Sequence, residues 1–522
     1  MVVTATSTVA RPAPPAAAAR PAPQDAPALA QLLGRPMPTD RVRGWVVALV
    51  LTVVGGVVRF WNLGWPTDQG TPIFDEKHYV PQAWQVLRNG GYEDNPGYEL
   101  VVHPPLSKQL MAVGQWVFGY DPVGWRAASA LAGTLCILAI VRIARRLTRS
   151  TLLGGLAGVL LIADGVSHVS ARVGMIDVFP ALFVLLAFGA LLVDRDDVRA
   201  RLATVVAEGR IGDSVWGPRL GIRWWRLAAG ACLGLSLAAK WSGLYYIAFF
   251  GLLLVGLDAA ARRAAGVARP FVGTLVRDVA PALWACLAVP VLLYVASWLP
   301  WIASETGTDR HVVGQQLPAG GLLPDWLRGL VYYSTKVLEF HATLDTPRGS
   351  PHPWESKPWT WPMGLRPMLY SYESGTGDLG CGSSSCVSAV MLIGTPAMWW
   401  LAVPALGWSL WRVVTAFDWR HAAVLVGYGA GFLPWFTNLD RQMYFFYMTP
   451  VAPFLVLAIV LALGEFLGRR EQGLERRHTG TLVVGVYTGL VVANFAWLWP
   501  ILVGTWITAD RWNAELWLPS WR

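Results

Sequence analysis

The chain has 522 residues, of which 54% are hydrophobic and only 14% are charged, and its mean hydropathy is +0.42. A soluble protein would carry roughly 25% charged residues, so the composition excludes an ordinary soluble domain. Apolar runs long enough to cross a bilayer recur along the sequence, which predicts an all-α polytopic membrane protein. The net charge is +9. Because the arginines cluster in short segments between apolar runs, they indicate cytoplasmic hinges, and we expect no nucleic-acid partner.

Residues 1–40 are rich in Pro and Ala and lack the apolar core of a signal peptide, which predicts an uncleaved, disordered cytoplasmic tail. Residues 41–299 are predicted to form an N-terminal transmembrane module with a first outer loop at 60–120. Residues 300–385 form a second outer loop, and residues 386–522 the C-terminal transmembrane helices. We expect about eleven spans, with the N-terminus inside and the C-terminus outside: 45–58, 123–140, 152–163, 178–193, 227–239, 244–257, 281–299, 387–411, 424–436, 444–463 and 481–499.

The first outer loop concentrates ionisable residues in a chain that has few of them, which indicates a functional edge on a membrane surface. Of the adjacent carboxylates Asp75 and Glu76, one could accept a proton from a hydroxyl while the other positions a substrate. The alternative is an ordinary surface pair. His103 precedes two prolines that stiffen the backbone, so it could orient a carboxylate or bind a metal. We favour orientation, because no second spaced ligand is present, and predict no metal site.

Three cations are expected on the same outer face as this loop, namely Arg172, Lys240 and Arg441. Each has apolar neighbours, so each alone could be a structural or snorkelling cation. Together they favour an anion at the membrane surface, and a lipid phosphate fits that position. The Pro- and Trp-rich segment at 350–367 suits sugars or extended Pro-containing peptides, or it could simply cover the bundle.

Five cysteines are too few for a disulfide framework. Cys136, Cys232 and Cys286 fall inside apolar spans and are interpreted as packing residues. Cys381 and Cys386 flank a short flexible spacer in the second outer loop. On an oxidising face they could close a disulfide; the alternatives are two free thiols or a weak metal site.

Several motifs, taken together and in this order, resemble the protein O-mannosyltransferases, which belong to the membrane GT-C glycosyltransferase superfamily. The matching pieces are Phe74-Asp75-Glu76-x-His78-Tyr79, His103-Pro104-Pro105-Leu106-x-Lys108, the turn from Arg172 to Asp177, Ala239-Lys240-Trp241-Ser242-Gly243-Leu244-Tyr245, His352-Pro353-Trp354-Glu355-Ser356-Lys357-Pro358-Trp359, and Leu433-Pro434-Trp435 followed by Arg441.

The resemblance implies a GT-C type bundle that transfers mannose from polyprenyl-phosphate-mannose to Ser or Thr hydroxyls of extended, Pro-containing polypeptides, with a possible coupling to secretion. It implies that Asp75 is the base and that no cofactor is needed beyond the lipid-linked donor. The second outer loop is too short for the β-trefoil insert of eukaryotic members, and the composition looks bacterial, so we expect the plasma membrane with the site on the outer face. The residues expected to position substrates are His78, His103, Asp177, Trp241, His352 and Glu355.

A phosphate diester is already a good leaving group, so one base and cations on the phosphate suffice for this chemistry. A single displacement would invert the anomeric centre. The nearest alternative is a related lipid-linked glycosyltransferase that moves another sugar, such as a pentose, onto lipid or wall glycan. A transporter is disfavoured, because no internal repeat is seen and the ionisable residues gather at one face instead of mid-span.

Overall fold

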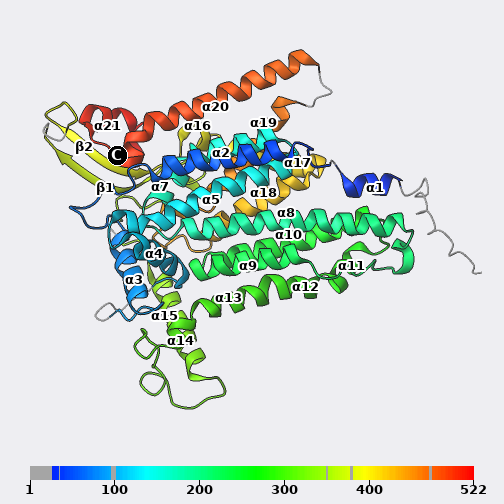
Figure 1. Cartoon of the computed structure of the whole chain (residues 1–522), viewed down its shortest axis with the longest axis horizontal. Coiled ribbons are helices and arrows are strands. Elements are labelled where there is room, and N and C mark those ends of the chain that lie inside the picture. The colour runs from blue at the N-terminus through cyan, green and yellow to red at the C-terminus, as the bar shows by residue number, and fades with distance from the viewer. Residues whose placement is uncertain (1–25, 35, 96–101, 348–350, 377–379, 469–472) are drawn as a thin grey trace, which may run out of the picture.

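The computed structural model describes residues 26–34, 36–95, 102–347, 351–376, 380–468 and 473–522. The chain is a bundle of long helices that run roughly side by side, and shorter helices and a small sheet gather at one end of it (Figure 1). The N-terminal half contains α1 (Ala26–Leu33), α2 (Arg41–Phe60), α3 (Glu76–Arg88), α4 (Leu106–Phe118), α5 (Pro122–Thr148), α6 (Thr151–Ile162), α7 (Gly165–Arg172), α8 (Val178–Ala207), α9 (Trp224–Ala239) and α10 (Gly243–Ala264).

The C-terminal half mixes helices with three strands. Its elements are α11 (Pro270–Arg277), α12 (Val279–Leu283), a π-helical turn η2 (Trp284–Ala288), α13 (Val289–Ser297), α14 (Leu299–Ile302), α15 (Asp325–Thr343), β1 (Met368–Gly375), β2 (Cys386–Leu392), α16 (Pro396–Trp399), α17 (Ala402–Ala416), α18 (Trp419–Phe432), the 3₁₀ turns η5 (Leu433–Phe436) and η6 (Phe445–Met448), α19 (Ala452–Leu467), α20 (Leu474–Val503), β3 (Ile507–Thr508) and α21 (Ala509–Glu515).

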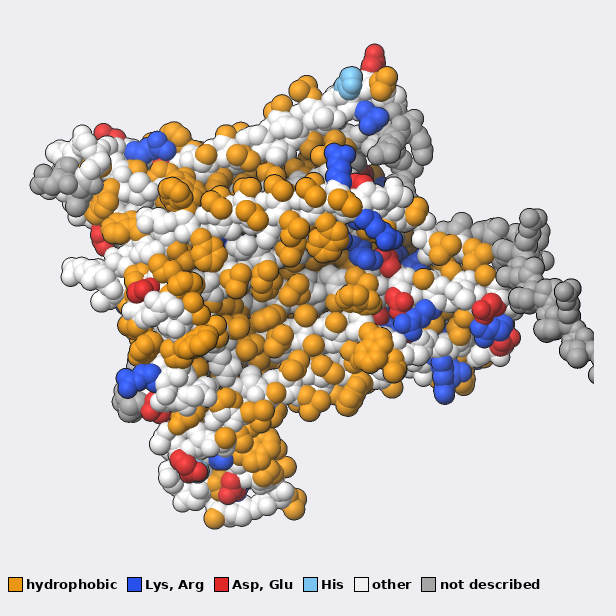
Figure 2. Space-filling view, viewed as in Figure 1, with side chains coloured by type: hydrophobic (Ala, Val, Ile, Leu, Met, Phe, Trp, Pro, Cys, Tyr) orange, Lys and Arg blue, Asp and Glu red, His pale blue; other side chains and the backbone are white. Residues whose placement is uncertain are grey.

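Helix α5 lies in the middle of the N-terminal half and contacts α2, α4, α6, α7 and α8. Its start is fixed locally, because the Asp121 carboxylate accepts from the Gly124 N–H at 2.7 Å and Pro122 occupies the first helical position. It ends at Arg149, whose left-handed backbone turns the chain into α6. Apolar side chains cover much of the face of the bundle seen in Figure 2, as expected for helices that face lipid.

By length and composition, six described helical segments could cross a membrane, or up to seven if the bent pair of α6 and α7 is one span. The predicted polytopic helical class is therefore confirmed, but the predicted number of about eleven spans is not. Several of the predicted spans, such as those at 227–239 and 424–436, correspond to α9 and α18, which have only 16 and 14 residues. In a sequence, an apolar run of this length looks the same whether the helix faces lipid or is covered by protein.

The predicted span at 387–411 is wrong over its first part. Residues Cys386–Leu392 form strand β2, which lies between β1 and β3 in a three-stranded antiparallel sheet. All seven residues of β2 are buried. A strand buried on both faces loses its alternation and becomes a continuous apolar run, which cannot be told from a helix by periodicity.

The predicted disordered tail is also wrong for residues 26–33, which form α1. Leu32 is buried against Val198, Leu202 and Ala261, so α1 packs on α8 and α10. Packing supplied by distant helices is absent from the local composition on which the prediction depended. Residues 1–25 lie outside the described residues.

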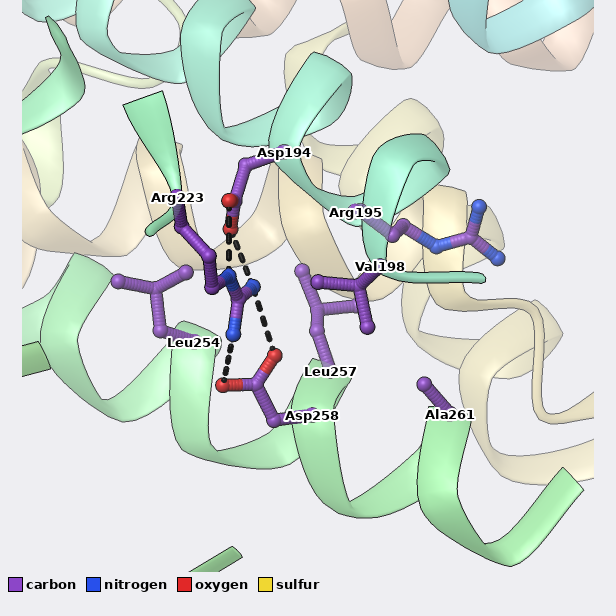
Figure 3. A pocket seen from close by; sticks show the side chains of 8 residues that line it. All are labelled: Asp194, Arg195, Val198, Arg223, Leu254, Leu257, Asp258 and Ala261. Atoms are coloured by element: carbon purple, nitrogen blue, oxygen red, sulfur yellow. Dashed lines mark hydrogen bonds and ion pairs between the residues drawn. The ribbon is translucent and has the colours of Figure 1, made fainter. Parts of the chain in front are cut away.

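Arginines gather at the end of the bundle where α1 lies (Figures 1 and 2). Near it, a buried network joins α8, α9 and α10: Arg223, just before α9, donates to both Asp194 and Asp258 (Figure 3). Arg226 of α9 also donates to Asp258, at 2.6 Å. Buried charges persist only when paired in this way. The network fixes one end of the bundle, opposite the end where α3, α4, β1 and β2 lie.

Candidate active site

The turn at Phe74 and Asp75 presents an acidic side chain at the end of the bundle where α3, α4, β1 and β2 lie. Phe74 has φ +48, a left-handed conformation that costs about 1–3 kcal/mol for a non-glycine residue. Asp75 follows as the residue before α3, and the Tyr79 N–H donates to its carbonyl at 3.2 Å. Its carboxylate is partly exposed and has no hydrogen bond or ion pair with any described residue. Asp75 is therefore available to a substrate.

The neighbouring carboxylate, Glu76, points into the protein. It is fully buried and accepts from Arg126 of α5 in a two-pronged ion pair, with Nε–Oε1 2.7 Å and Nη2–Oε2 2.8 Å. The Gly174 N–H donates to Oε1 at 2.6 Å and the Ile73 N–H to Oε2 at 3.1 Å. A Cβ at position 174 would lie only 3.1 Å from Oε1. Glu76 is thus fully occupied as an anchor, and this holds Asp75 on the other side of the turn.

Burial raises the pKa of the Asp75 carboxyl above its ordinary value, and the nearby Asp177 carboxylate adds to the rise. His78 and Lys240 oppose it. A carboxylate with a raised pKa is a stronger base than an ordinary aspartate, so this environment favours proton acceptance. Arg172 is not among the described charges that shift this pKa.

Lys240 and Asp177 form an ion pair beside Asp75. Asp177 precedes α8 and Lys240 follows α9, and the Lys240 Nζ lies 2.6 Å from Asp177 Oδ1. The Lys240 Nζ also lies 5.3 Å from the centre of the Tyr447 ring. Asp177 Oδ2 is buried and has no hydrogen-bond partner among the described residues. Asp177 therefore compensates part of the lysine charge and fixes its position.

Aromatic rings from distant segments surround this group. The Phe74 ring stacks on Tyr370 of β1, with 4.5 Å between ring centroids, and meets Phe446 of η6 edge-on at 6.2 Å. Tyr370 lies at a β-bulge, where the register of β1 against β2 shifts between Leu369 and Ser371. A bulge of this kind changes the direction in which a side chain points. The second outer loop and the C-terminal half thereby contribute to the same site as the first outer loop.

Two histidines and Arg441 lie next to the aromatic group. The His103 ring is 5.9 Å from Tyr79 and 5.5 Å from His341 of α15, measured between centroids. Burial holds the pKa of His103 well below its ordinary range, and the cations Lys240 and Arg441 act in the same direction. Arg441 donates from Nη1 to the His341 carbonyl at 2.6 Å. His103 and Arg441 were expected at this face; His341 was not, because an isolated histidine in a long loop carries no pattern.

The other predicted residues take more varied positions. Glu355 pairs with Lys357 at 2.8 Å, and Lys357 also donates to the Arg441 carbonyl at 2.9 Å. The His352 ring meets Tyr444 edge-on at 5.3 Å. Trp241 has different neighbours, since it packs against an aromatic cluster that includes Trp298, Trp301 and Tyr333.

Arg172 serves the end of α2. Its guanidinium donates to the carbonyls of Arg59 at 2.8 Å, Trp61 at 2.5 Å and Asn62 at 3.2 Å. These are carbonyls at or just beyond the C-terminus of a helix, which lack helical partners. The structure also joins Cys381 and Cys386 in a disulfide in the hairpin that links β1 to β2, with Cα atoms 6.0 Å apart.

A helical membrane bundle with an acidic turn at one end is the architecture expected of a GT-C glycosyltransferase, and a solved structure agrees in fold. The chain resembles the Saccharomyces cerevisiae protein O-mannosyltransferase Pmt1–Pmt2 complex bound to the sugar donor, with a TM-score of 0.71 at 15% identity, over 96% of this chain and 95% of that one. Residues 326–521 match a protein-family model described as the C-terminal four-TMM region of protein-O-mannosyltransferase.

Curated relatives extend the similarity over nearly the whole chain. A polyprenol-phosphate-mannose–protein mannosyltransferase of Mycolicibacterium smegmatis is 55% identical, covering 93% of this chain and 94% of the relative. Proteins of the same name from Mycobacterium tuberculosis and Corynebacterium glutamicum are 56% and 45% identical, covering 93% and 91% of this chain and 93% and 92% of their own lengths. The chain belongs to the polyprenol-phosphate-mannose–protein mannosyltransferase family, which confirms the resemblance seen in the motifs.

The anchor role of Glu76 predicts a loss of stability when this residue is replaced. Glu76→Ala should lower the free energy of unfolding by about 3–5 kcal/mol, because Arg126 would be left as an uncompensated buried charge. Thermal unfolding of the purified protein in detergent measures the change. The matched control is the adjacent Lys77→Ala, which breaks only an exposed pair with Asp68 and should leave the melting temperature unchanged. Equal melting temperatures for both variants and the parent protein would show that Glu76 does not anchor the turn.

Proposed function

We propose that this chain transfers mannose from polyprenyl-phosphate-mannose to Ser or Thr hydroxyls of polypeptides, with inversion at the anomeric carbon. The observation that carries the proposal is the Asp75 carboxylate. It is unpaired within the described chain, has a pKa raised by burial, and lies beside the cation Lys240. The family to which the chain belongs supports the donor and the protein acceptor, since the relatives are named for both.

In the proposed step, the acceptor oxygen forms a bond to C1 of mannose on the face opposite the phosphate. The C1–O bond to phosphate breaks, and polyprenyl phosphate leaves with the electron pair. The hydroxyl proton passes to Asp75, which later releases it to solvent. A phosphate diester needs no general acid to leave, so a single base suffices, and such a base contributes roughly 10²–10⁴-fold in rate.

The leaving phosphate requires positive charge. We assign this role to Lys240 and Arg441, both of which act electrostatically on the His103 ring of the site. Arg172 supports the site indirectly in this proposal, because its guanidinium is committed to carbonyls at the end of α2. Glu76 and Asp177 act as positioning residues for Asp75 and Lys240.

The remaining predicted residues are proposed to shape the acceptor side of the site. His78 lies exposed on the first turn of α3, close enough to influence Asp75. His352 and Glu355 belong to the segment of the second outer loop that borders Tyr444 and Arg441. Trp241, which packs away from Asp75, is proposed to support the turn that carries Lys240.

The base assignment and the donor are tested together. Purified protein in detergent should transfer labelled mannose from polyprenyl-phosphate-mannose to a Ser/Thr-containing peptide. Asp75→Asn should reduce kcat by about 10²–10⁴-fold without lowering the melting temperature, because the amide cannot accept the proton. The control Asp68→Asn removes an exposed carboxylate nearby and should keep full activity. Transfer from a polyprenyl-phosphate-pentose but not from the mannose donor would select the alternative sugar, and substantial turnover by Asp75→Asn would exclude this base.

The raised pKa of Asp75 predicts an acid limb in the rate. Asp75 works only when deprotonated, so kcat/KM should fall as the pH drops through its pKa, with a midpoint above the ordinary value of about 3.9. His78→Ala should move this limb to higher pH, because His78 lowers the Asp75 pKa. A pH–rate profile of both proteins gives the two midpoints. A limb at or below the ordinary value, or a shift to lower pH in the variant, would contradict the assignment.

We infer further that the protein lies in the plasma membrane with its N-terminus in the cytoplasm and the Asp75 site outside. The arginine-rich end of the bundle lies opposite this site, as the tendency of Lys and Arg to stay in the cytoplasm requires. Glu305 is three residues beyond α14, which lies toward the site end of the bundle, and Arg210 is three residues beyond the far end of α8. In intact cells, a membrane-impermeant maleimide should label a Glu305→Cys variant and should not label Arg210→Cys. Labelling of Arg210→Cys without labelling of Glu305→Cys would show that the protein has the opposite orientation in the membrane.

A further inference from the structure

The guanidinium of Arg441 makes its two described hydrogen bonds to one residue, His341, and lies 5.9 Å from the centre of the Trp435 ring. Arg441 donates from Nη1 to the His341 carbonyl at 2.6 Å and from Nη2 to the His341 ring nitrogen Nδ1 at 3.2 Å. The two segments are also joined through the backbone, because the Gln442 N–H donates to the Leu344 carbonyl at 2.9 Å. The end of α15 and the chain around Arg441 therefore form one unit.

These contacts fix the protonation state of the His341 ring. An arginine can only donate, so Nδ1 must accept and carries no proton. The other ring nitrogen, Nε2, lies 3.2 Å from the Val102 carbonyl, which can only accept, so Nε2 carries the proton. The neutral tautomer with its proton on Nε2 satisfies both contacts at once. Burial and Arg441 lower the pKa of His341 to about 4, in agreement with a neutral ring.

His341 thereby connects three segments that are far apart in sequence. Val102 precedes His103, whose ring lies 5.5 Å from the His341 ring and 5.9 Å from Tyr79, one helical turn after Asp75. On the other side His341 holds Arg441. The contact joins the first outer loop, α15 of the second outer loop and the chain that carries the proposed phosphate-binding arginine.

Arg441 retains unused hydrogen-bonding capacity. A guanidinium has five N–H groups, and the contacts with His341 use two of them. Its Nε is buried and has no hydrogen-bond partner among the described residues. A buried donor without an acceptor is costly, so this arginine is poised to bind an anion. The oxygens of a phosphate diester match a guanidinium in charge and geometry.

We propose that His341 is a positioning residue for the donor: it holds Arg441 through Nδ1 and the backbone carbonyl, so that the remaining N–H groups bind the phosphate of the lipid-linked sugar. This inference rests on the proposed function. In this proposal His341 acts through Arg441, to which both its ring and its carbonyl are bonded, and its main contribution is to donor binding. Its removal therefore raises the KM for the donor by a larger factor than it lowers kcat, because Lys240 still supplies positive charge to the leaving phosphate.

The test compares two replacements of the ring. His341→Phe keeps an aromatic ring of similar size but accepts no hydrogen bond, and the donor KM should rise about tenfold, as expected for the loss of one charge-assisted hydrogen bond. His341→Asn supplies an oxygen close to the position of Nδ1 and should stay within about threefold of the parent KM. His311→Asn, at an exposed position on the same side of the molecule, is the matched control and should change nothing.

A double variant separates this role from a general loss of packing. If His341 acts through Arg441, then Arg441→Ala and the combined His341→Phe/Arg441→Ala variant should have the same donor KM, because no bond remains for the histidine to make. A His341→Phe protein with the parent KM, an Asn variant as poor as the Phe variant, or additive effects in the double variant would overturn the proposal. If His341→Phe cannot be purified folded, His341→Ala takes its place in both comparisons. A parent protein that transfers no mannose would instead reject the proposed function.

Discussion

The ion pair between Glu76 and Arg126 is the contact on which the geometry of the site depends. Arg126 extends from α5 at the centre of the N-terminal bundle and also donates to the carbonyls of Leu63 at 3.1 Å and Pro66 at 2.8 Å. Glu76 in turn accepts from the Gly174 N–H. Four segments thus meet around two buried charges. The energetic cost of burying them is offset only when every partner is in place, so the contact specifies one arrangement of the first outer loop.

This anchor explains why two adjacent carboxylates have different roles. At the start of a helix, neighbouring side chains point in different directions, so Asp75 remains partly exposed while Glu76 is fixed in the core. The strained backbone of Phe74 is compatible with this because its ring stacks on Tyr370. Glu76 supplies rigidity, and its neighbour Asp75 is the proposed base. In active sites, the residues that contact the substrate are commonly held in place by other residues that do not contact it.

The second outer loop completes the site from the other side. Tyr370 comes from β1, while His341 ends α15 and fixes both Arg441 and the backbone before His103. The β-sheet that carries Tyr370 is itself attached to the bundle through β2, where Ser388 donates to the Gly504 carbonyl at 2.7 Å. Asp75 and the proposed phosphate-binding Arg441 are consequently held by different halves of the chain. Their separation depends on the packing between those halves.

The amino-acid sequence determined the membrane class, the family, and the residues at which ionisable groups interrupt apolar runs, because hydropathy and motif order are properties of the chain itself. Asp75, Asp177 and Lys240 were found in this way. The tertiary structure alone decided that Glu76 is an anchor, that Arg172 serves the carbonyls after α2, and that His341 belongs to the site. It also decided that residues 386–392 are a strand, although they read as part of a span. The physical reason is the same in each case: the partner of a buried charge, or of a strand edge, lies far away in the chain, and no local pattern records it.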